Sequence, residues 1–543
     1  MPQLVLGPLL RYVGSTTATV WVETDAPCEV EVLGHRDRTF HVEGHHYALV
    51  LLEGLAPGSE RRYEVHLDGA PVWPLADGRP PSVIRTRAHE RRARLVFGSC
   101  RVAAPHVPPY TLPKERHREA YGVDALRALS KRLQARADPV PDCLLLLGDQ
   151  VYADEVSPRT REFIRSRRDP TVPPGEQIAD FEEYTRLYRE SWSDPDIRWL
   201  LSTVPSTMIF DDHDLHDDWN ISEEWVREMR ALPWWGERVV GAFMSYWLYQ
   251  HLGNLAPPEL ADDDLLRALR GDDDGGPRLR GFAELADRES AAGRWAFHRD
   301  FGRTRLVVVD SRAARVLRDG SRNMVDDEEW EWIAAHTRGE FDHLIIASTL
   351  PAFMLHGVHH LEAWNEAVCS GAWGRAAARV GERIRRGLDL EHWPAFQRSF
   401  RRLTDLLEEL ATGDGTTRPP ATISLLGGDV HHAYVARVTL PGSPESRIHQ
   451  LVCSPFRNPL SPRERRVIRL MASPWTARCT RWLARRAGVA KARAEWDVVD
   501  GPTFDNSVAV LEIDERRAAV TISRSALLGD AEDTLHPLLH RVL

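Results

Sequence analysis

The chain has 543 residues, a formal net charge of −10 at pH 7 and 28% charged residues of both signs. Because this length exceeds what one hydrophobic core usually supports, we expect at least two domains with sizeable cores. The 43% hydrophobic content argues against a disordered chain, and the negative balance argues against a general nucleic-acid-binding protein, so no nucleic-acid partner is expected.

No targeting or membrane-spanning segment is visible. The first residues, MPQL, are not a basic region followed by a long apolar stretch, and no apolar run approaches the ~20 residues of a transmembrane helix. The six cysteines lack paired spacing, so we expect no disulfide framework. These observations predict a cytoplasmic protein, although a leader lost before residue 1 would leave no trace.

The first 88 residues have the pattern of a small all-β domain. Residues 17–23, 28–32 and 63–67 alternate between polar and apolar, with Gly and Pro between them. The turn at 54–58 and the strand after it resemble fibronectin-type domains. We therefore predict a fibronectin/Ig-like β-sandwich over residues 1–88, followed by a polar linker at 85–94.

From about residue 93, apolar runs alternate with long charged stretches typical of helices. Near-continuous apolar runs are typical of strands covered on both faces, so a layered α/β domain is expected. We place this domain at residues 93–525 and a C-terminal tail at 526–543. Residues 507–513 and 518–522 are predicted to form a hairpin near its end.

Four of these apolar runs end directly in groups that bind metals or transfer protons. The groups are Cys100 after residues 94–97, Asp149 and Tyr152 after 144–147, Asp211, Asp212, His213 and Asp214 after 208–210, and Asp429, His431 and His432 after 423–426. In an open α/β sheet, loops at the carboxyl ends of strands converge on one crevice. The sequence therefore makes metal-assisted hydrolysis the first hypothesis.

Two hard cations about 3.5 to 4 Å apart can bind a phosphate ester and stabilise in-line displacement when a carboxylate bridges them. Asp149 is the natural bridge, and Tyr152 could reach the same metal, where a phenolate suits ferric iron better than zinc or magnesium. Asp212 would give an oxygen to the other cation. Taken singly, each segment has an ordinary alternative: a helix cap for Asp149, a surface ion pair for His213, and a core histidine at 431 or 432.

Together and in this order, the four segments resemble the calcineurin-like metallophosphoesterases, and more closely their alkaline phosphatase D (PhoD-like) branch. The sequence departs from the general family pattern as that branch does: Cys100 replaces a histidine, Asp212 an asparagine and Asp429 another histidine. The match spans about residues 93–460. The resemblance implies an α/β/β/α metallophosphatase sandwich.

The resemblance also implies two metal sites of unlike chemistry. Cys100, Asp149, Tyr152 and His431 would hold a ferric ion, whose charge would keep the thiol deprotonated. Asp149, Asp212 and Asp429 would offer only oxygens to a second hard cation, calcium by family likeness or another hard divalent metal.

Three further residues are candidates for catalysis. His213 would hydrogen-bond the phosphate or protonate the leaving oxygen. Asp214 could orient His213 or make only a loop hydrogen bond. Arg312 resembles the arginine of an Asp-Thr-Arg segment in the PhoD-like branch; it could clamp phosphate oxygens or form a salt bridge to Asp310 or a neighbouring helix.

Two segments stay ambiguous at this point. His356, His359 and His360 could line the pocket and bind metal, or could be loop and packing residues. The basic segment at 463–493 carries ten Lys and Arg interleaved with apolar residues. It could lie on a membrane or an anionic partner, form a solvated helix face over the core, or roof the site and attract anionic substrates.

We therefore expect a hydrolase of phosphoric esters, an alkaline phosphatase D-like phosphomonoesterase or phosphodiesterase, in which a metal-bound hydroxide attacks phosphorus without a phosphoenzyme. The substrate would be a small-molecule or lipid phosphate ester. The alternatives are a phosphodiesterase specific for nucleotide, lipid or cell-wall diesters, and a non-catalytic binding protein on the same scaffold. No residue pattern indicates the oligomeric state.

Overall fold

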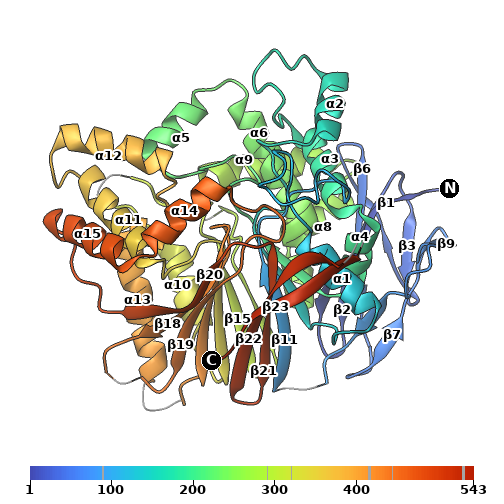
Figure 1. Ribbon diagram of the computed structural model, residues 1–543. Coiled ribbons are helices and arrows are strands. Elements are labelled where there is room, and N and C mark those ends of the chain that lie inside the picture. The colour runs from blue at the N-terminus through green and yellow to red at the C-terminus, as the bar shows by residue number, and fades with distance from the viewer. Residues whose placement is uncertain (89–90, 290–291, 319–320, 414–417, 443, 529–531) are drawn as a thin grey trace.

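Two β-sheets form the centre of the molecule, as the computed structural model in Figure 1 shows. The structure describes residues 1–88, 91–289, 292–318, 321–413, 418–442, 444–528 and 532–543. Within each sheet the strands that precede the polar motifs run parallel to one another. Their carboxyl ends therefore lie along a common edge, which is where the sequence pattern places the site.

The first sheet has six strands in the order β13-β12-β11-β21-β22-β23. The strands are β11 (Arg92–Gly98), β12 (Cys143–Leu147), β13 (Ser206–Ile209), β21 (Ser507–Asp514), β22 (Arg517–Leu528) and β23 (Glu532–Val542). β21 and β22 form the predicted hairpin. Residues 526–543 are not the expected tail: apart from 529–531, which lie outside the described residues, they complete β22 and form the edge strand β23.

The second sheet has seven strands in the order β14-β15-β16-β17-β19-β18-β20. The strands are β14 (Phe297–Phe301), β15 (Thr304–Val309), β16 (His343–Ser348), β17 (Thr422–Gly427), β18 (Ala433–Thr439), β19 (Arg447–Val452) and β20 (Glu495–Thr503). Strands β15, β16, β17 and β19 are parallel, and buried residues fill both of their faces. This is why they read in the sequence as continuous apolar runs.

The two sheets share one hydrophobic core between them. Leu306 and Val308 of β15 pack into a cluster with Leu95 and Phe97 of the first sheet. Their neighbours Val307 and Val309 point the other way and belong to a second cluster, which also contains residues of the helix α13 (Gln397–Thr412). The helix α1 (Ala125–Gln134) contacts β21, β22 and β23 of the first sheet. This α/β/β/α arrangement confirms the predicted fold class.

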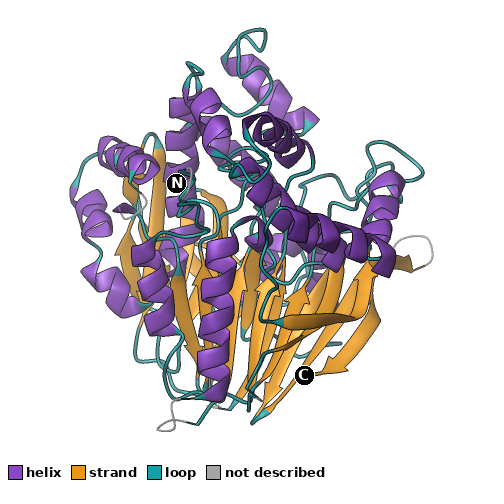
Figure 2. Cartoon of the chain, turned by 90° about the vertical axis from the view of Figure 1, so that its left-hand side faces the viewer, coloured by secondary structure: helices purple, strands orange, loops and turns teal. Residues whose placement is uncertain are grey.

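The other helices lie around this core, and Figure 2 shows several of them in front of the strands on the left of the view and others above the strand ends. They are α2 (Pro158–Arg167), α3 (Phe181–Trp192), α4 (Pro195–Thr203), α5 (Glu223–Arg230), α6 (Trp235–Tyr246), α7 (Pro257–Asp262), α8 (Asp264–Gly271), α9 (Gly276–Arg288), α10 (Asp327–His336), α11 (His356–Cys369), α12 (Arg375–Gly387), α14 (Pro462–Met471) and α15 (Pro474–Arg486). Across the described residues, no helix has the length and apolar character needed to cross a membrane.

An all-β domain precedes the α/β core, as predicted, and lies at the right of Figure 1 in blue. Its sheets are β1-β2-β6-β5, β4-β3-β8-β9 and the ribbon β10-β7. The strands are β1 (Leu4–Val13), β2 (Ala18–Thr24), β3 (Glu29–Val32), β4 (His35–Arg38), β5 (Phe40–Val42), β6 (His45–Leu52), β7 (Glu60–Arg62), β8 (Val65–Leu67), β9 (Ala70–Trp73) and β10 (Val83–Arg85). Residues 89–90 of the predicted linker lie outside the described residues.

Arg11 ties this domain to the α/β core. Its guanidinium is fully buried and donates to the backbone carbonyls of Ser206 (3.2 Å), Tyr249 (2.7 Å) and Gln250 (2.7 Å) and to Asn254 Oδ1 (3.2 Å). A buried charge needs such partners, because each unsatisfied group keeps its full desolvation cost. The N-terminal domain is therefore fixed to the core by a buried polar contact.

Replacing this arginine tests the contact. Arg11→Met removes several charge-assisted hydrogen bonds and leaves buried carbonyls unpaired, so we expect the free energy of unfolding to fall by about 3 to 5 kcal/mol. Arg36→Met on β4 is the control, since its side chain is 61% exposed and should change stability by less than about 1 kcal/mol. Urea denaturation measures both. Equal effects would contradict a docking role for Arg11.

Candidate metal centre

The strand ends of the two sheets bring together two groups of metal-binding side chains that share one residue. Cys100, Asp149 and His431 form the first group, and Asp149, Asp211, Asp212 and Asp429 form the second. In each group, ligand atoms of all members lie within 4.8 Å of one another. The first group offers sulfur, nitrogen and oxygen, whereas the second offers only carboxylate oxygens. Asp149 therefore lies where a bridging carboxylate is needed, and Asp211 joins the second group without having been predicted as a ligand.

Four of these residues adopt a backbone conformation that side chains other than glycine rarely take. The φ angles are 58° at Cys100, 50° at Asp149, 62° at Asp429 and 51° at His431. Such left-handed residues cost energy and occur preferentially at functional sites. Short loop contacts hold them: Arg101 donates its backbone N–H to the Asp149 carbonyl at 3.2 Å, and the Asp429 N–H donates to Ser99 Oγ at 2.9 Å.

Glycines before two of the aspartates allow these loops to approach each other. Gly148 has a φ of 91°, and a Cβ there would lie 2.7 Å from Asp211 Oδ2 and overlap the Asp211 Cβ. A Cβ on Gly428 would lie 2.6 Å from the Ser99 Cβ. The Gly-Asp pairs in the sequence therefore mark backbone segments packed too closely for any side chain.

Gly148→Ala tests this packing requirement. The left-handed backbone alone costs about 1 to 2 kcal/mol, and the overlap with Asp211 adds about 1 to 3 kcal/mol. Gly34→Ala is the matched control, because Gly34 has a φ of 85° but open space around its Cβ position. Urea unfolding of chelator-treated protein should show a larger loss for Gly148→Ala, and metal analysis should show lower metal content for that variant only.

The buried carboxylates fit a hard cation pair. Asp149 Oδ1 and Asp211 Oδ2 are buried and have no hydrogen-bond partner. Burial raises the pKa of Asp149 well above its usual range; His213 opposes the rise, whereas Asp211 and Asp212 add to it. Burial and then the charges of Asp149 and Asp429 likewise raise the pKa of the Cys100 thiol. Bound cations would remove these penalties and hold the groups in their anionic forms.

Tyr152 lies beside the shared carboxylate. Its hydroxyl donates to Asp149 Oδ2 at 3.4 Å and accepts a hydrogen bond from Asn458 Nδ2 at 3.2 Å. Its ring packs against the imidazole of His213, with 4.6 Å between the centroids. The phenol oxygen is thus adjacent to the first group of ligands, where the sequence pattern places it.

His213 is oriented by Asp154 rather than by Asp214. The Nδ1 atom of His213 lies 3.0 Å from Asp154 Oδ1. Burial lowers the pKa of His213, but the Asp154 carboxylate outweighs burial and raises this pKa well above its usual range. Asp214 accepts the backbone N–H groups of Asp211 (3.0 Å) and Val151 (3.3 Å). Of the two roles open for Asp214, the structure therefore shows the loop hydrogen bond.

Arg312 lies among the carboxylates of the site. Its fully buried guanidinium is 2.5 Å from Asp211, 2.6 Å from Glu391, 3.2 Å from Asp212 and 3.4 Å from Asp429. Asp310 is contacted through the backbone N–H of Arg312, at 2.8 Å. Because the guanidinium of Arg312 is paired with four carboxylates, its observed contacts hold the acidic groups together. These contacts do not support the predicted role as a phosphate clamp.

A loop between α12 and α13 adds residues that sequence reasoning missed. His392 Nδ1 lies 2.7 Å from Glu362 of α11, and its Nε2 lies 3.3 Å from Asp429 Oδ2. Burial lowers the pKa of His392, but Glu362 and Asp429 raise it to about 10. No apolar strand precedes this loop, so a search for polar groups at the ends of apolar runs does not find His392. The only signal is a charged pair, Glu391 and His392, between Leu390 and Trp393.

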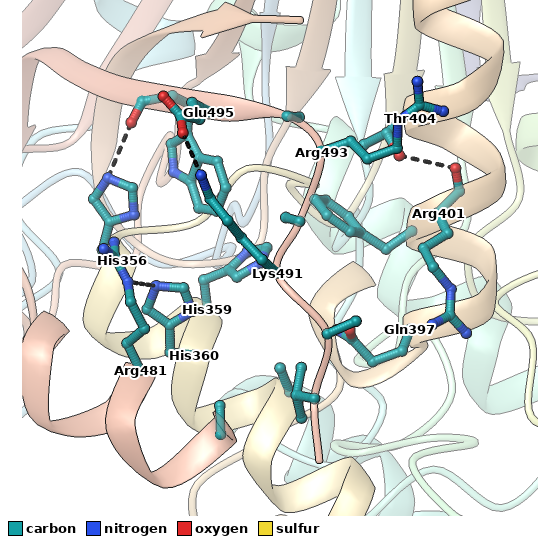
Figure 3. Close-up of a pocket in the computed structure, with 18 of the residues that line it drawn as sticks. His356, His359, His360, Gln397, Arg401, Thr404, Arg481, Lys491, Arg493 and Glu495 are labelled. Carbon is teal, nitrogen blue, oxygen red and sulfur yellow. Dashed lines mark hydrogen bonds and ion pairs between the residues drawn. The ribbon is translucent and has the colours of Figure 1, made fainter. Parts of the chain in front are cut away.

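His356, His359 and His360, whose role the sequence left open, do not lie at the metal centre. They line a separate cavity of about 490 Å³, shown in Figure 3. His356 Nε2 lies 3.0 Å from the Trp496 carbonyl, and His359 packs on the Trp496 ring with 4.4 Å between centroids. His360 accepts a hydrogen bond from Arg481 Nε at 3.0 Å. Among the described residues, these three histidines belong to neither group of candidate metal ligands. Their observed contacts are those of packing and pocket-lining residues.

A cavity of about 340 Å³ opens directly at the metal centre. Asp212, His213, Asp429 and His431 line it, together with residues of α11 and α14. The basic segment 463–493 forms α14 and α15, and α14 places Val467, Ile468 and Met471 on the cavity wall. Of the three interpretations of the basic segment, the one that places it over the site agrees with the position of α14.

Comparisons with known proteins agree with this geometry. Residues 124–258 match the PhoD-like phosphatase family, and residues 1–84 match a domain of unknown function, DUF7800. The PhoD-like match contains Asp149, Tyr152 and the 211–214 motif. No curated protein sequence matches the chain.

Among solved structures, one titled "Structure of PhoD" aligns with a TM-score of 0.58 and 11% identity, over 99% of this chain and 90% of that chain. A maltogenic amylase from S. marinus aligns with a TM-score of only 0.16 and 9% identity, over 95% of this chain and 76% of that chain, which carries no argument about fold. The resemblance found in the sequence motifs is thus confirmed: the chain carries a PhoD-like phosphatase segment at residues 124–258 and has the fold of PhoD over nearly its whole length.

Proposed function

We propose that the protein is a metal-dependent hydrolase of phosphoric esters. The observation that carries the proposal is the pair of candidate ligand groups, unlike in chemistry, that share Asp149, with Tyr152 beside Asp149 and packed against His213. Cys100, Tyr152, Asp149 and His431 would hold a ferric ion, and Asp149, Asp212 and Asp429, now joined by Asp211, would hold a calcium ion or another hard divalent metal. When bound, the two ions would supply positive charge to the phosphate oxygens and a nucleophile at neutral pH.

The residues of the chain then have separable tasks. Asp154 holds Nδ1 of His213 and so fixes the imidazole, which leaves Nε2 to donate a proton to the departing alcohol oxygen. His213 lines the cavity, so this nitrogen can meet an ester bound there. Arg312 offsets the mutual repulsion of Asp211, Asp212 and Asp429, which keeps the carboxylates close enough to act together.

A phosphodiesterase is the second candidate, and the charge of the cavity favours it. Among the described residues that line the cavity, none is lysine or arginine, whereas Asp217, Asp218 and Asp389 are present at its wall. A diester carries one negative charge less than a fully ionised monoester, so it meets less repulsion there. Parallel assays on a nitrophenyl phosphomonoester and a nitrophenyl phosphodiester should give the higher kcat/KM for the diester. A preference for the monoester would reject this candidate.

The metal assignment predicts a coloured protein. Purified protein should contain roughly one ferric ion per chain and show a tyrosinate charge-transfer band in the visible range. Tyr152→Phe should remove the band, Cys100→Ser should lower the iron content, and Asp149→Asn should lose both metals and all hydrolysis. Cys369→Ser, outside the ligand groups, is the control and should keep iron and colour. A colourless protein that contains only zinc would refute the assignment of Cys100 and Tyr152.

The role of Asp154 predicts a dependence on the leaving group. Asp154→Asn should lower kcat about 10- to 100-fold for a phenyl ester, whose alcohol needs a proton, with KM and metal content nearly unchanged. For a nitrophenyl ester, which leaves without protonation, the loss should be much smaller. Asp264→Asn is the control, because the side chain of Asp264 on α8 is 93% exposed and does not line the cavity. An equal loss with both esters would mean that Asp154 has only a structural role.

A further inference from the structure

The cavity at the metal centre has two unlike walls. One wall carries the polar groups of the candidate centre, among them Asp212, His213 and Asp429. Another part of the lining, which we call the apolar wall, is made of hydrocarbon side chains: α11 contributes Val358 and Leu361, and α14 contributes Val467, Ile468 and Met471. A phosphate bound at the polar wall would therefore extend its alcohol part along hydrocarbon side chains.

The apolar side of α14 is not used to build the hydrophobic core. None of the residues of α14 is buried, and Val467 is 57% exposed although it faces the cavity. Leu388, on the loop after α12, lines the same cavity and is also 57% exposed. Exposed apolar side chains gathered at one place mark a surface that gains free energy when a ligand covers it. Core packing does not explain this wall.

The position of this wall is fixed by a close helix contact. A Cβ on Gly357 of α11 would overlap the carbonyl oxygen of Met471, so the end of α14 sits directly on the backbone of α11. The start of α14 is capped, because Ser461 accepts the Glu464 N–H while the Glu464 side chain accepts the Ser461 N–H. The helix therefore has a capped start and rests on α11 at its end, while Val467, Ile468 and Met471 line the cavity.

We propose that the substrate is a phosphoric ester of an apolar alcohol, whose hydrocarbon chain lies against α11 and α14. This inference rests on the proposed function and names its substrate class. A sugar or nucleoside needs hydrogen-bond partners along its length, and the five side chains of this wall offer none. Hydrocarbon needs only apolar area, and each methylene that leaves water for the wall tightens binding.

The test measures binding separately from hydrolysis. n-Alkylphosphonates from ethyl to hexyl, which cannot be hydrolysed, are titrated into the metal-loaded protein by calorimetry. We expect Kd to fall roughly threefold per methylene, and so on the order of a hundredfold from ethyl to hexyl. A Kd that does not change with chain length would overturn the inference. If Kd depends on chain length but no ester is hydrolysed, the proposed hydrolase function is refuted, whereas the inference that the apolar wall binds hydrocarbon stands.

Two variants of one helix locate the effect. Val467→Asn and Ile468→Asn should weaken hexylphosphonate binding by about tenfold and leave ethylphosphonate binding unchanged. Leu470→Asn is the matched control, since Leu470 is 56% exposed on the same helix but is not part of the cavity wall. It should keep the full dependence on chain length. Equal losses in Leu470→Asn and Val467→Asn would show that α14 does not form the binding wall.

A last comparison separates two sources of such an ester. Hydrolysis of a hexyl ester is measured in dilute solution, and that of a long-chain ester is measured in vesicles of a neutral phospholipid. Both should be hydrolysed by the parent protein, and Val467→Asn should lower kcat/KM for both. Activity on the dissolved ester alone would identify a soluble substrate, and higher activity on vesicles would identify a membrane lipid. Hydrolysis of a methyl ester as fast as the hexyl ester would contradict the inference in either setting.

Discussion

The structure depends on keeping four carboxylates together in a buried place. Asp149, Asp211, Asp212 and Asp429 come from three loops, and their repulsion would drive those loops apart without opposite charge. Arg312 provides part of that charge from a fully buried position. His392 adds positive charge beside Asp429, and under the proposed function bound cations would supply the remainder. The strand-end loops of both sheets bring the four carboxylates together, and residues of α11 and α14 line the cavity beside them.

The strain in the loops has the same origin. Ligands can converge from both sheets only if the backbone turns sharply at the ends of the strands, and the left-handed residues Cys100, Asp149, Asp429 and His431 provide those turns. Gly148 and Gly428 remove the side chains that would keep the loops apart. The hydrophobic core between the sheets supplies the stability that offsets this local cost.

Much of this arrangement could be predicted from the sequence because strand ends are a local pattern. Apolar runs followed by Asp149, Asp212 or Asp429 are visible without knowledge of the fold, and parallel strands bring their ends to one edge. The partners of those residues could not be predicted. Asp154 rather than Asp214 holds His213, and Glu391 and His392 reach the centre from a loop with no strand before it. Such contacts depend on tertiary packing. The edge strand β23 was missed for the same reason, since its pairing partner decides that it is a strand.

The pairing of β11 has a consequence for how the molecule is made. β11 lies between β12, which follows it closely in the chain, and β21, which begins only at Ser507. The strand that leads to Cys100 therefore lacks one neighbour until residues 507–514 have been synthesised. Contacts so distant in sequence form slowly, because a long loop must close first. During synthesis this edge of β11 therefore stays open until β21 has been made, and the loop that carries Cys100 gains its second supporting strand only then.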